Sequence, residues 1–182
     1  MQEYEITIAG CRRKLPVCSV NKDLSIAAFI MFGDVEITEE CAKALLQKCS
    51  AHDVILTAEA KAIPLCYEMA RIGCRDYVVA RKTVKVYMHN PISVQVRSIT
   101  TQREQSLFLA EDKARRLRGR RVLIVDDVIS TGNSLHALEE LVRQAGGAVV
   151  GKAAVLAEGD AAKRDDIIYL APLPLFMQGA AD

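Results

Sequence analysis

The sequence lacks the features that mark a membrane protein or a nucleic-acid-binding protein. None of its apolar runs approaches the roughly 20 residues that a membrane-spanning helix needs. The start, Met1–Glu5, is too polar and too acidic for a secretory signal. The 24 lysines and arginines are balanced by 23 aspartates and glutamates, so no excess charge indicates a polyanionic partner. We therefore expect a cytoplasmic protein that binds neither a membrane nor a nucleic acid.

The sequence also lacks cysteine spacings that would form a zinc site or a redox motif. Its six cysteines all lie in the first half, without a C-x-x-C pair and without histidines at metal-binding spacing. Several fall on apolar positions of predicted helices, which indicates buried thiols in a reducing compartment. No internal repeat or low-complexity segment is present. At 182 residues we expect one domain with a substantial core.

The most informative stretch runs from Val122 to Ser134. The apolar, mostly β-branched residues 122–125 predict a buried strand over 122–126, with Asp126 and Asp127 at its carboxyl end. A loop of small residues, 130–134, then leads into a helix predicted over 135–145. The loop N–H groups and the helix dipole favour an anion, whereas the carboxylates suit hydroxyls or a shared cation. The combination predicts a sugar phosphate ligand; the alternative is an ordinary strand–turn–helix with an Asp-Asp turn.

This stretch resembles the motif with which type I phosphoribosyltransferases bind phosphoribosyl pyrophosphate (PRPP). In that family two acidic residues and two spacers precede Ser/Ala-Thr-Gly-Gly-Thr. Here Asn133 replaces the second glycine and Ser134 the final threonine; asparagine tolerates a left-handed backbone and serine keeps the hydroxyl. The resemblance implies that the loop binds the 5-phosphate and that the acidic pair contacts the ribose and acts in catalysis. The implied PRPP-binding residues are Asp126, Asp127, Val128, Ile129, Ser130, Thr131, Gly132, Asn133 and Ser134.

Two further loops follow predicted strands. Glu59-Ala60-Lys61-Ala62 comes after a strand at 54–58, and Arg81-Lys82-Thr-Val-Lys85 after a strand at 76–80. Both resemble loops of adenine-type phosphoribosyltransferases and their archaeal relatives, which hold pyrophosphate with backbone N–H groups and cations. Ala62 stands where glycine is usual, and a positive φ there would cost about 1 kcal/mol. The implied pyrophosphate-binding residues are Ala60, Lys61, Arg81, Lys82 and Lys85; the alternative for the basic segment is a solvated strand end.

The remaining pattern predicts an α/β fold with a doubly wound parallel sheet. Thr38 is the expected N-cap of a helix that ends near Ser50. The other predicted elements are a helix over 63–72, a strand over 149–157 and an N-terminal hairpin of strands 4–9 and 15–20. Such sheets bind ligands at the carboxyl ends of their strands. The resemblance adds a hood from about 1–35 and 158–182, a core from 36–157, and a β-hairpin flap within 84–110. The basic run 113–121 is expected to be a solvated face.

Two residues, Phe32 and Glu158, are candidates for contact with the base, and Glu104 is a candidate catalytic residue. Phe32-Gly33-Asp34 resembles the Phe-x-Asp segment that lies over the purine in adenine-type enzymes, which implies that Phe32 contacts the ring. Glu104 falls on the flap where such enzymes carry a glutamate proposed to manage the purine proton. Glu158 follows the strand after the PRPP helix, where enzymes for 6-oxopurines tend to have lysine. A carboxylate accepts hydrogen bonds and repels a carbonyl oxygen, so Glu158 favours an exocyclic amine.

The sequence therefore predicts a purine phosphoribosyltransferase of purine salvage. It would transfer the 5-phosphoribosyl group from PRPP to a purine, with adenine favoured, and release pyrophosphate. Mg²⁺ would be held through PRPP near Asp126 and Asp127 rather than directly by the protein, and the resemblance implies a homodimer. The alternatives are a hypoxanthine/guanine or xanthine phosphoribosyltransferase, and a regulator that keeps the PRPP site as a sensor without transferase activity.

Overall fold

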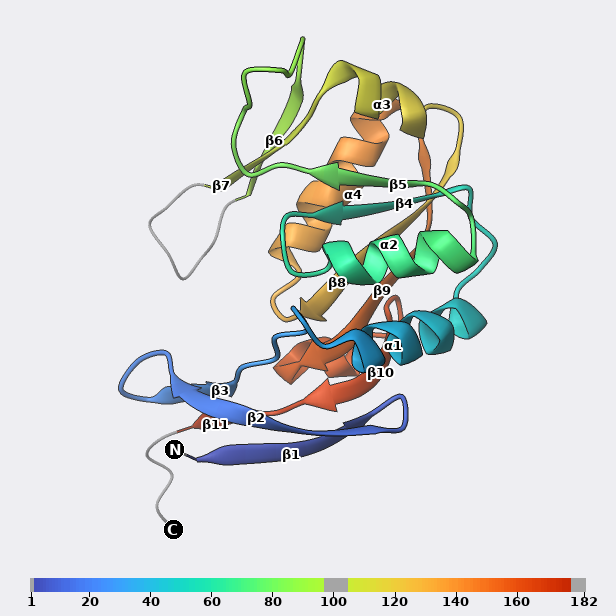
Figure 1. Ribbon diagram of the computed structural model, residues 1–182. Coiled ribbons are helices and arrows are strands. Elements are labelled where there is room, and N and C mark those ends of the chain that lie inside the picture. Colours follow the sequence, from blue (N-terminus) through green and yellow to red (C-terminus); the bar gives the residue numbers. More distant parts are fainter. Residues whose placement is uncertain (1, 97–104, 178–182) are drawn as a thin grey trace.

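A parallel sheet of five strands forms the centre of the molecule (Figure 1). The computed structural model describes residues 2–96 and 105–177. Each neighbouring pair of strands in this sheet is parallel, which requires a long crossover between strands and explains why helical runs separate most of them in the sequence. The predicted α/β class with a doubly wound sheet is confirmed. In spatial order the strands are β10 (Ile168–Leu173), β9 (Ala148–Glu158), β8 (Arg121–Ile129), β4 (Val54–Ala58) and β5 (Tyr77–Ala80).

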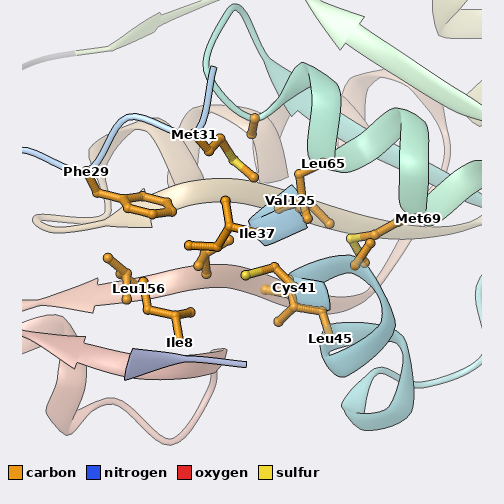
Figure 2. Packing of buried hydrophobic residues seen from close by; sticks show 14 of the residues in the cluster. Ile8, Phe29, Met31, Ile37, Cys41, Leu45, Leu65, Met69, Val125 and Leu156 are labelled. Atoms are coloured by element: carbon orange, nitrogen blue, oxygen red, sulfur yellow. The ribbon is translucent and has the colours of Figure 1, made fainter. Parts of the chain in front are cut away.

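Helices cover both faces of this sheet because its strands are apolar on both sides. Along β8, Leu123 and Val125 belong to one core cluster, whereas Val122 and Ile124 belong to the other. The first cluster includes the inner faces of α1 and α2, whose packing against β8 and β9 is seen in Figure 2. The second includes the inner face of α4. The helices are α1 (Val35–Lys48), α2 (Ile63–Ile72) and α4 (Asn133–Ala145).

The start of α1 differs from the prediction. The cap is Asp34, whose carboxylate accepts a hydrogen bond from the Ile37 N–H at 3.2 Å. The predicted cap, Thr38, is wrong because this residue lies in the first helical turn, where its hydroxyl donates to the Asp34 carbonyl at 2.7 Å. Aspartate and threonine are both good caps, so their preferences alone did not separate the two positions. The helix therefore begins earlier than expected, and it ends at Lys48.

A second sheet of four antiparallel strands lies at one end of the molecule and is called the hood below (Figure 1). The predicted N-terminal hairpin is present, with its second strand starting at Cys11 rather than Leu15. The C-terminal β11 pairs with β3, so the two ends of the chain meet in this sheet. The structure differs from the prediction at β10, which joins the central sheet instead of the hood. The hood strands are β1 (Glu3–Ile8), β2 (Cys11–Ser19), β3 (Leu24–Ala27) and β11 (Leu175–Met177).

A β-hairpin projects from the central sheet at the expected flap. It consists of β6 (Ile92–Val96) and β7 (Gln105–Leu109), and the tip that carries Glu104 lies outside the described residues. A short helix that was not predicted, α3 (Glu111–Leu117), follows it. The basic run after the flap is not simply a solvated face, because Arg116 and Arg120 both form ion pairs with Asp76. In the described ranges no helix is both long and apolar enough to cross a bilayer.

Candidate active site

Two adjacent aspartates, Asp126 and Asp127, lie in the second half of β8 (Arg121–Ile129). The prediction ended this strand at Asp126, but its pairing with β9 continues to Ile129. Asp127 is almost fully buried, and its N–H donates to Asp126 Oδ1 at 2.9 Å. Burial and the neighbouring charge of Asp127 raise the pKa of Asp126 above its ordinary value. The pair is therefore well suited to accept hydroxyl donors or a cation, and poorly suited to an anion.

The loop between β8 and α4 forms a small anion-sized hollow. Gly132 adopts a left-handed backbone with φ of +81°, and α4 begins at the next residue without a side-chain cap. The first N–H groups of a helix lack partners within it, so they can bind an anion here. Asn133 is the first helical residue, so its tolerance of a left-handed backbone is not used. The hollow has a volume of about 120 Å³ and is lined by Asp126, Val128, Ile129, Ser130, Thr131, Gly132, Asn133, Ser134 and Leu135.

The loop after β4 reaches the acidic pair. Lys61 Nζ lies 2.7 Å from Asp127 Oδ2, although the two residues come from different strand ends. The lysine side chain is half exposed, whereas that of the aspartate is 5% exposed. Ala62 has φ of −83°, in the right-handed region, so the departure from glycine brings no backbone penalty at this position. The loop thus has an accessible cation directly beside the carboxylates.

The loop after β5 is joined to the loop after β4 by Glu59. Arg81 Nε lies 3.1 Å from Glu59 Oε2, and the backbone N–H of Lys82 donates to Glu59 Oε1. Sequence reasoning did not select Glu59 as a site residue, although its position directly after β4 was the available signal. Lys85 is not brought into this group; among the described residues its contact is a turn in which its carbonyl accepts from the Met88 N–H at 2.9 Å.

These loops place cations and carboxylates of three strands side by side. The sheet order puts β4 and β5 on one side of β8, so Lys61, which contacts Asp127, and Arg81, which pairs with Glu59, both come from that side. Both cations are held by carboxylates, on Asp127 and Glu59 respectively. A ligand with several negative charges can displace these carboxylates because it offers more charge to each cation. The arrangement suits a ligand with one anionic group in the α4 loop and another near Arg81.

The residues expected at the base are less closely connected to this group. Phe32 is 51% exposed, and Asp34, two residues on, is taken up by Arg13, whose Nε and Nη2 donate to its carboxylate at 2.6 and 2.9 Å. Arg13 accordingly lowers the pKa of Asp34. Glu158 ends β9, where it pairs in register with Leu173 of β10. Within the described residues no hydrogen bond or ion pair connects Phe32 or Glu158 to the loops above.

The site does not contain a metal centre built by the protein alone. Across residues 2–96 and 105–177, no cluster of three or more His, Cys, Asp and Glu side chains could hold a metal ion. The acidic pair nevertheless fits a cation, because Asp127 Oδ2 already contacts an ammonium group at 2.7 Å. Two carboxylates are too few for a complete magnesium shell, so the remaining ligands would have to come from the bound molecule.

Comparison with known proteins identifies relatives of this arrangement. The family model of the phosphoribosyl transferase domain matches residues 34–172. An adenine phosphoribosyltransferase of Rhodococcus opacus is 32% identical over 126 residues, which are 69% of either chain. A hypoxanthine/guanine phosphoribosyltransferase of Methanococcus voltae is 33% identical over 108 residues, which are 59% of this chain and 54% of that protein. The crystal structure of an adenine phosphoribosyltransferase from Rhodothermus marinus has the same fold, with a TM-score of 0.68, 21% identity and 94% coverage of both chains.

One relative of a different kind also matches. The purine biosynthesis transcriptional repressor PurR of Bacillus subtilis is 31% identical over 99 residues, which are 54% of this chain and 34% of the repressor. The chain therefore spans between a third and about two thirds of the length of these three relatives.

Proposed function

Since this chain belongs to the phosphoribosyl transferase domain family, we propose that it transfers the 5-phosphoribosyl group of PRPP to a purine base in purine salvage. The observation that carries the proposal is the combination of a buried acidic pair on β8, the glycine loop that opens α4, and two cations from neighbouring strand ends. The loop would bind the 5-phosphate, and Asp126 and Asp127 would face the ribose hydroxyls. Ala60, Lys61, Arg81 and Lys82 would surround the pyrophosphate.

In this reaction a bond forms between a purine nitrogen and C1 of the ribose, and the bond from C1 to the pyrophosphate oxygen breaks. The purine nitrogen gives up its proton to a general base, the role that the resemblance implies for Glu104. Pyrophosphate leaves with the electron pair of that bond, so negative charge grows on it while C1 becomes oxocarbenium-like. Lys61 and Arg81 are fixed where that charge develops, which lowers the barrier. The hairpin of β6 and β7 would act as the flap that covers the site and excludes water from C1.

Mg²⁺ is the cofactor that fits this chemistry. Oxygens of the bound PRPP would hold it close to Asp126 and Asp127, and it would supply charge neutralisation at the diphosphate. Before PRPP binds, the ammonium of Lys61 lies against Asp127 in a position that neutralises the same carboxylate. The proposal therefore predicts that PRPP binding depends on Mg²⁺ more strongly than binding of ribose 5-phosphate, which lacks the diphosphate.

Adenine is the proposed acceptor. Glu158 lies at the carboxyl end of β9, and its carboxylate can accept a hydrogen bond from the amine at C6 of adenine but repels the carbonyl oxygen of hypoxanthine or xanthine. The name of the Rhodococcus relative supports the same base. The name of the Methanococcus relative favours the second candidate, a hypoxanthine/guanine enzyme. A competition assay with PRPP and equal concentrations of adenine, hypoxanthine, guanine and xanthine decides between them; hypoxanthine or xanthine consumed first would refute the argument from Glu158.

A sensor without transferase activity is the alternative from another class. The match to the PurR repressor, which by its name is a transcriptional regulator, favours it. Both readings require PRPP binding, so only turnover separates them. A transferase consumes PRPP when a purine is present and forms one pyrophosphate for each nucleotide, whereas a sensor binds PRPP and leaves it intact.

We further propose that the protein is a homodimer. The support is an exposed apolar surface on α1 and α2, in which Val35 and Tyr67 are 68% and 55% exposed. A hollow of about 440 Å³ lies in the same surface, between α1 and α2. Light scattering on the wild type and on Tyr67→Asp tests this, and Met177→Asp, a substitution of a 69% exposed residue on the hood, is the control. A dimer that persists in Tyr67→Asp would move the interface elsewhere.

A cytoplasmic location is consistent with the state of the cysteines. All six are free thiols. Burial raises the pKa of Cys41 to about 12 and that of Cys49 to about 11, so these thiols remain protonated and unreactive. Fractionation of the cells that make the protein would test the proposed location.

A further inference from the structure

Arg164 lies against the glycine of the phosphate loop. It caps the short helix η1 (Gly159–Lys163), in the connection from β9 to β10. A methyl group built on Gly132 would come within 2.6 Å of Arg164 Nη1. The guanidinium thus occupies the space that any larger side chain at Gly132 would need. This contact links the loop before α4 to the connection from β9 to β10.

The guanidinium is held in place by a chain of ion pairs. Its Nε and Nη2 donate to the two carboxylate oxygens of Asp166 at 2.8 and 2.7 Å. Lys152 Nζ lies 2.5 Å from the same carboxylate and 3.0 Å from Glu139 Oε1, on α4. Two cations beside it lower the pKa of Asp166, so the bidentate pair persists at neutral pH. Among the described residues, Nη1 is the part of the guanidinium that Asp166 leaves free, and it is the part that faces Gly132.

We propose that Arg164 is a positioning residue for the phosphate of the ribosyl donor; this rests on the function proposed above. It fixes the backbone of Gly132, at the start of α4, and adds positive charge on the side of the loop nearest β9. The sheet order separates it from the pyrophosphate group, because β4 and β5 lie on the other side of β8. The two ends of PRPP are therefore served by cations from opposite sides of β8, Arg164 for the 5-phosphate and Lys61 and Arg81 for the diphosphate.

The test compares two ligands that each carry one end of PRPP. Isothermal titration of the full-length protein with ribose 5-phosphate and, separately, with pyrophosphate gives both affinities. Arg164→Gln should weaken ribose 5-phosphate by about tenfold or more, because the loop loses a nearby positive charge and the group that fixes Gly132, and leave pyrophosphate within about twofold. Arg164→Lys, which keeps the charge, should recover part of the loss. The control is Lys163→Gln, whose parent side chain is adjacent but 81% exposed and paired with Asp160.

Three outcomes would overturn the inference. Equal affinity of Arg164→Gln and wild type for ribose 5-phosphate would refute it and leave the proposed function intact. Similar losses for both ligands would show a general structural role instead. A wild type that binds neither ribose 5-phosphate nor PRPP would refute the inference and the proposed function together. If Arg164→Gln does not fold, Arg164→Lys decides. A folded lysine variant that binds both ribose 5-phosphate and pyrophosphate as tightly as the wild type contradicts the need for the planar guanidinium.

A double-mutant cycle tests the contact itself without any ligand. Gly132→Ala lowers the melting temperature through its positive φ and through the clash with Nη1. Only the second contribution disappears when Arg164 is shortened. The effects of Gly132→Ala and Arg164→Gln should therefore be non-additive, with a smaller penalty for the alanine in the glutamine background. Strict additivity would mean that Arg164 does not occupy this position in solution.

Discussion

Removing the cation beside the acidic pair should destabilise the protein more than removing a similar surface cation. Lys61 Nζ and Asp127 Oδ2 are 2.7 Å apart. Their gross attraction is about 6 kcal/mol at an effective dielectric constant of about 20. Desolvation and side-chain ordering offset most of it: an exposed pair contributes about 0–1 kcal/mol, and breaking a fully buried one costs about 3–5 kcal/mol. With a buried aspartate but a half-exposed lysine, we expect Lys61→Met to cost about 1–2 kcal/mol.

A closely matched control is available in Lys43. Its ammonium lies 2.7 Å from Glu40 and its side chain is 51% exposed, against 2.7 Å and 50% for Lys61, but its partner carboxylate is 41% exposed. The two substitutions to methionine therefore differ mainly in the burial of the carboxylate left behind. For a chain of this length, thermal unfolding should show a drop of about 2–8 °C for Lys61→Met, and a much smaller one for Lys43→Met.

The dependence on pH gives a second check. Lys61 lowers the pKa of Asp126, so its removal raises that pKa further. The penalty exists where the carboxyls are ionised and shrinks as the pH falls, because the pair then takes up a proton. The loss in Lys61→Met should be larger at pH 8 than at pH 5. Equal losses in the two lysine variants, or a loss that does not depend on pH, would refute the reasoning.

The remaining predictions concern the two aspartates, Arg81 and Ala62. The double variant Asp126→Asn, Asp127→Asn should stay folded by circular dichroism and lose PRPP binding by calorimetry; near-normal affinity would contradict the assignment. Asp126→Asn alone should raise the melting temperature at pH 7.5, and the gain should shrink toward pH 4. The raised pKa of Asp126 means that, above the ordinary carboxyl pKa of about 4, the native state binds more protons than the unfolded chain. The wild type therefore loses stability as the pH rises, and the variant does not have this loss. Arg81→Ala should lower kcat/KM by a factor that corresponds to a loss of about 2–4 kcal/mol of transition-state stabilisation. If kcat/KM stays within about threefold of the wild-type value, Arg81 is only a surface residue. Ala62→Gly should lower stability by up to about 1 kcal/mol in chemical unfolding, because φ at this position is negative; a gain would indicate a different loop conformation.

The parallel strands and the glycine turn before α4 could be predicted because their signals are local. The buried strands β4, β5 and β8 are short apolar runs, and Gly132 precedes an amphipathic helix. The short α3 was missed because only Leu117 of this helix is buried, which leaves almost no periodic signal. The strand β8 continues past Asp126 because it pairs with β9 as far as Ile129. The two aspartates interrupt the apolar pattern that would have predicted this continuation.

The contacts between loops could not be predicted, since they depend on tertiary structure. Glu59 meets Arg81, and Lys61 meets Asp127, only because parallel strands bring their carboxyl ends to one edge. The contact of Arg164 with Gly132 joins residues from separate elements in the same way. A sequence motif identifies the residues of each loop, but it does not show which residue of another loop pairs with each charged side chain.

The most direct test of the central claim is a phosphorus NMR time course of the full-length protein with PRPP, Mg²⁺ and adenine in one sample. The proposed function predicts that the PRPP signals disappear while those of pyrophosphate and an adenine nucleotide 5-phosphate appear in equal amounts, and that the double variant at Asp126 and Asp127 gives no change. PRPP that remains intact with adenine and with the other three purines, in a protein that binds it, would contradict transferase activity and favour the sensor.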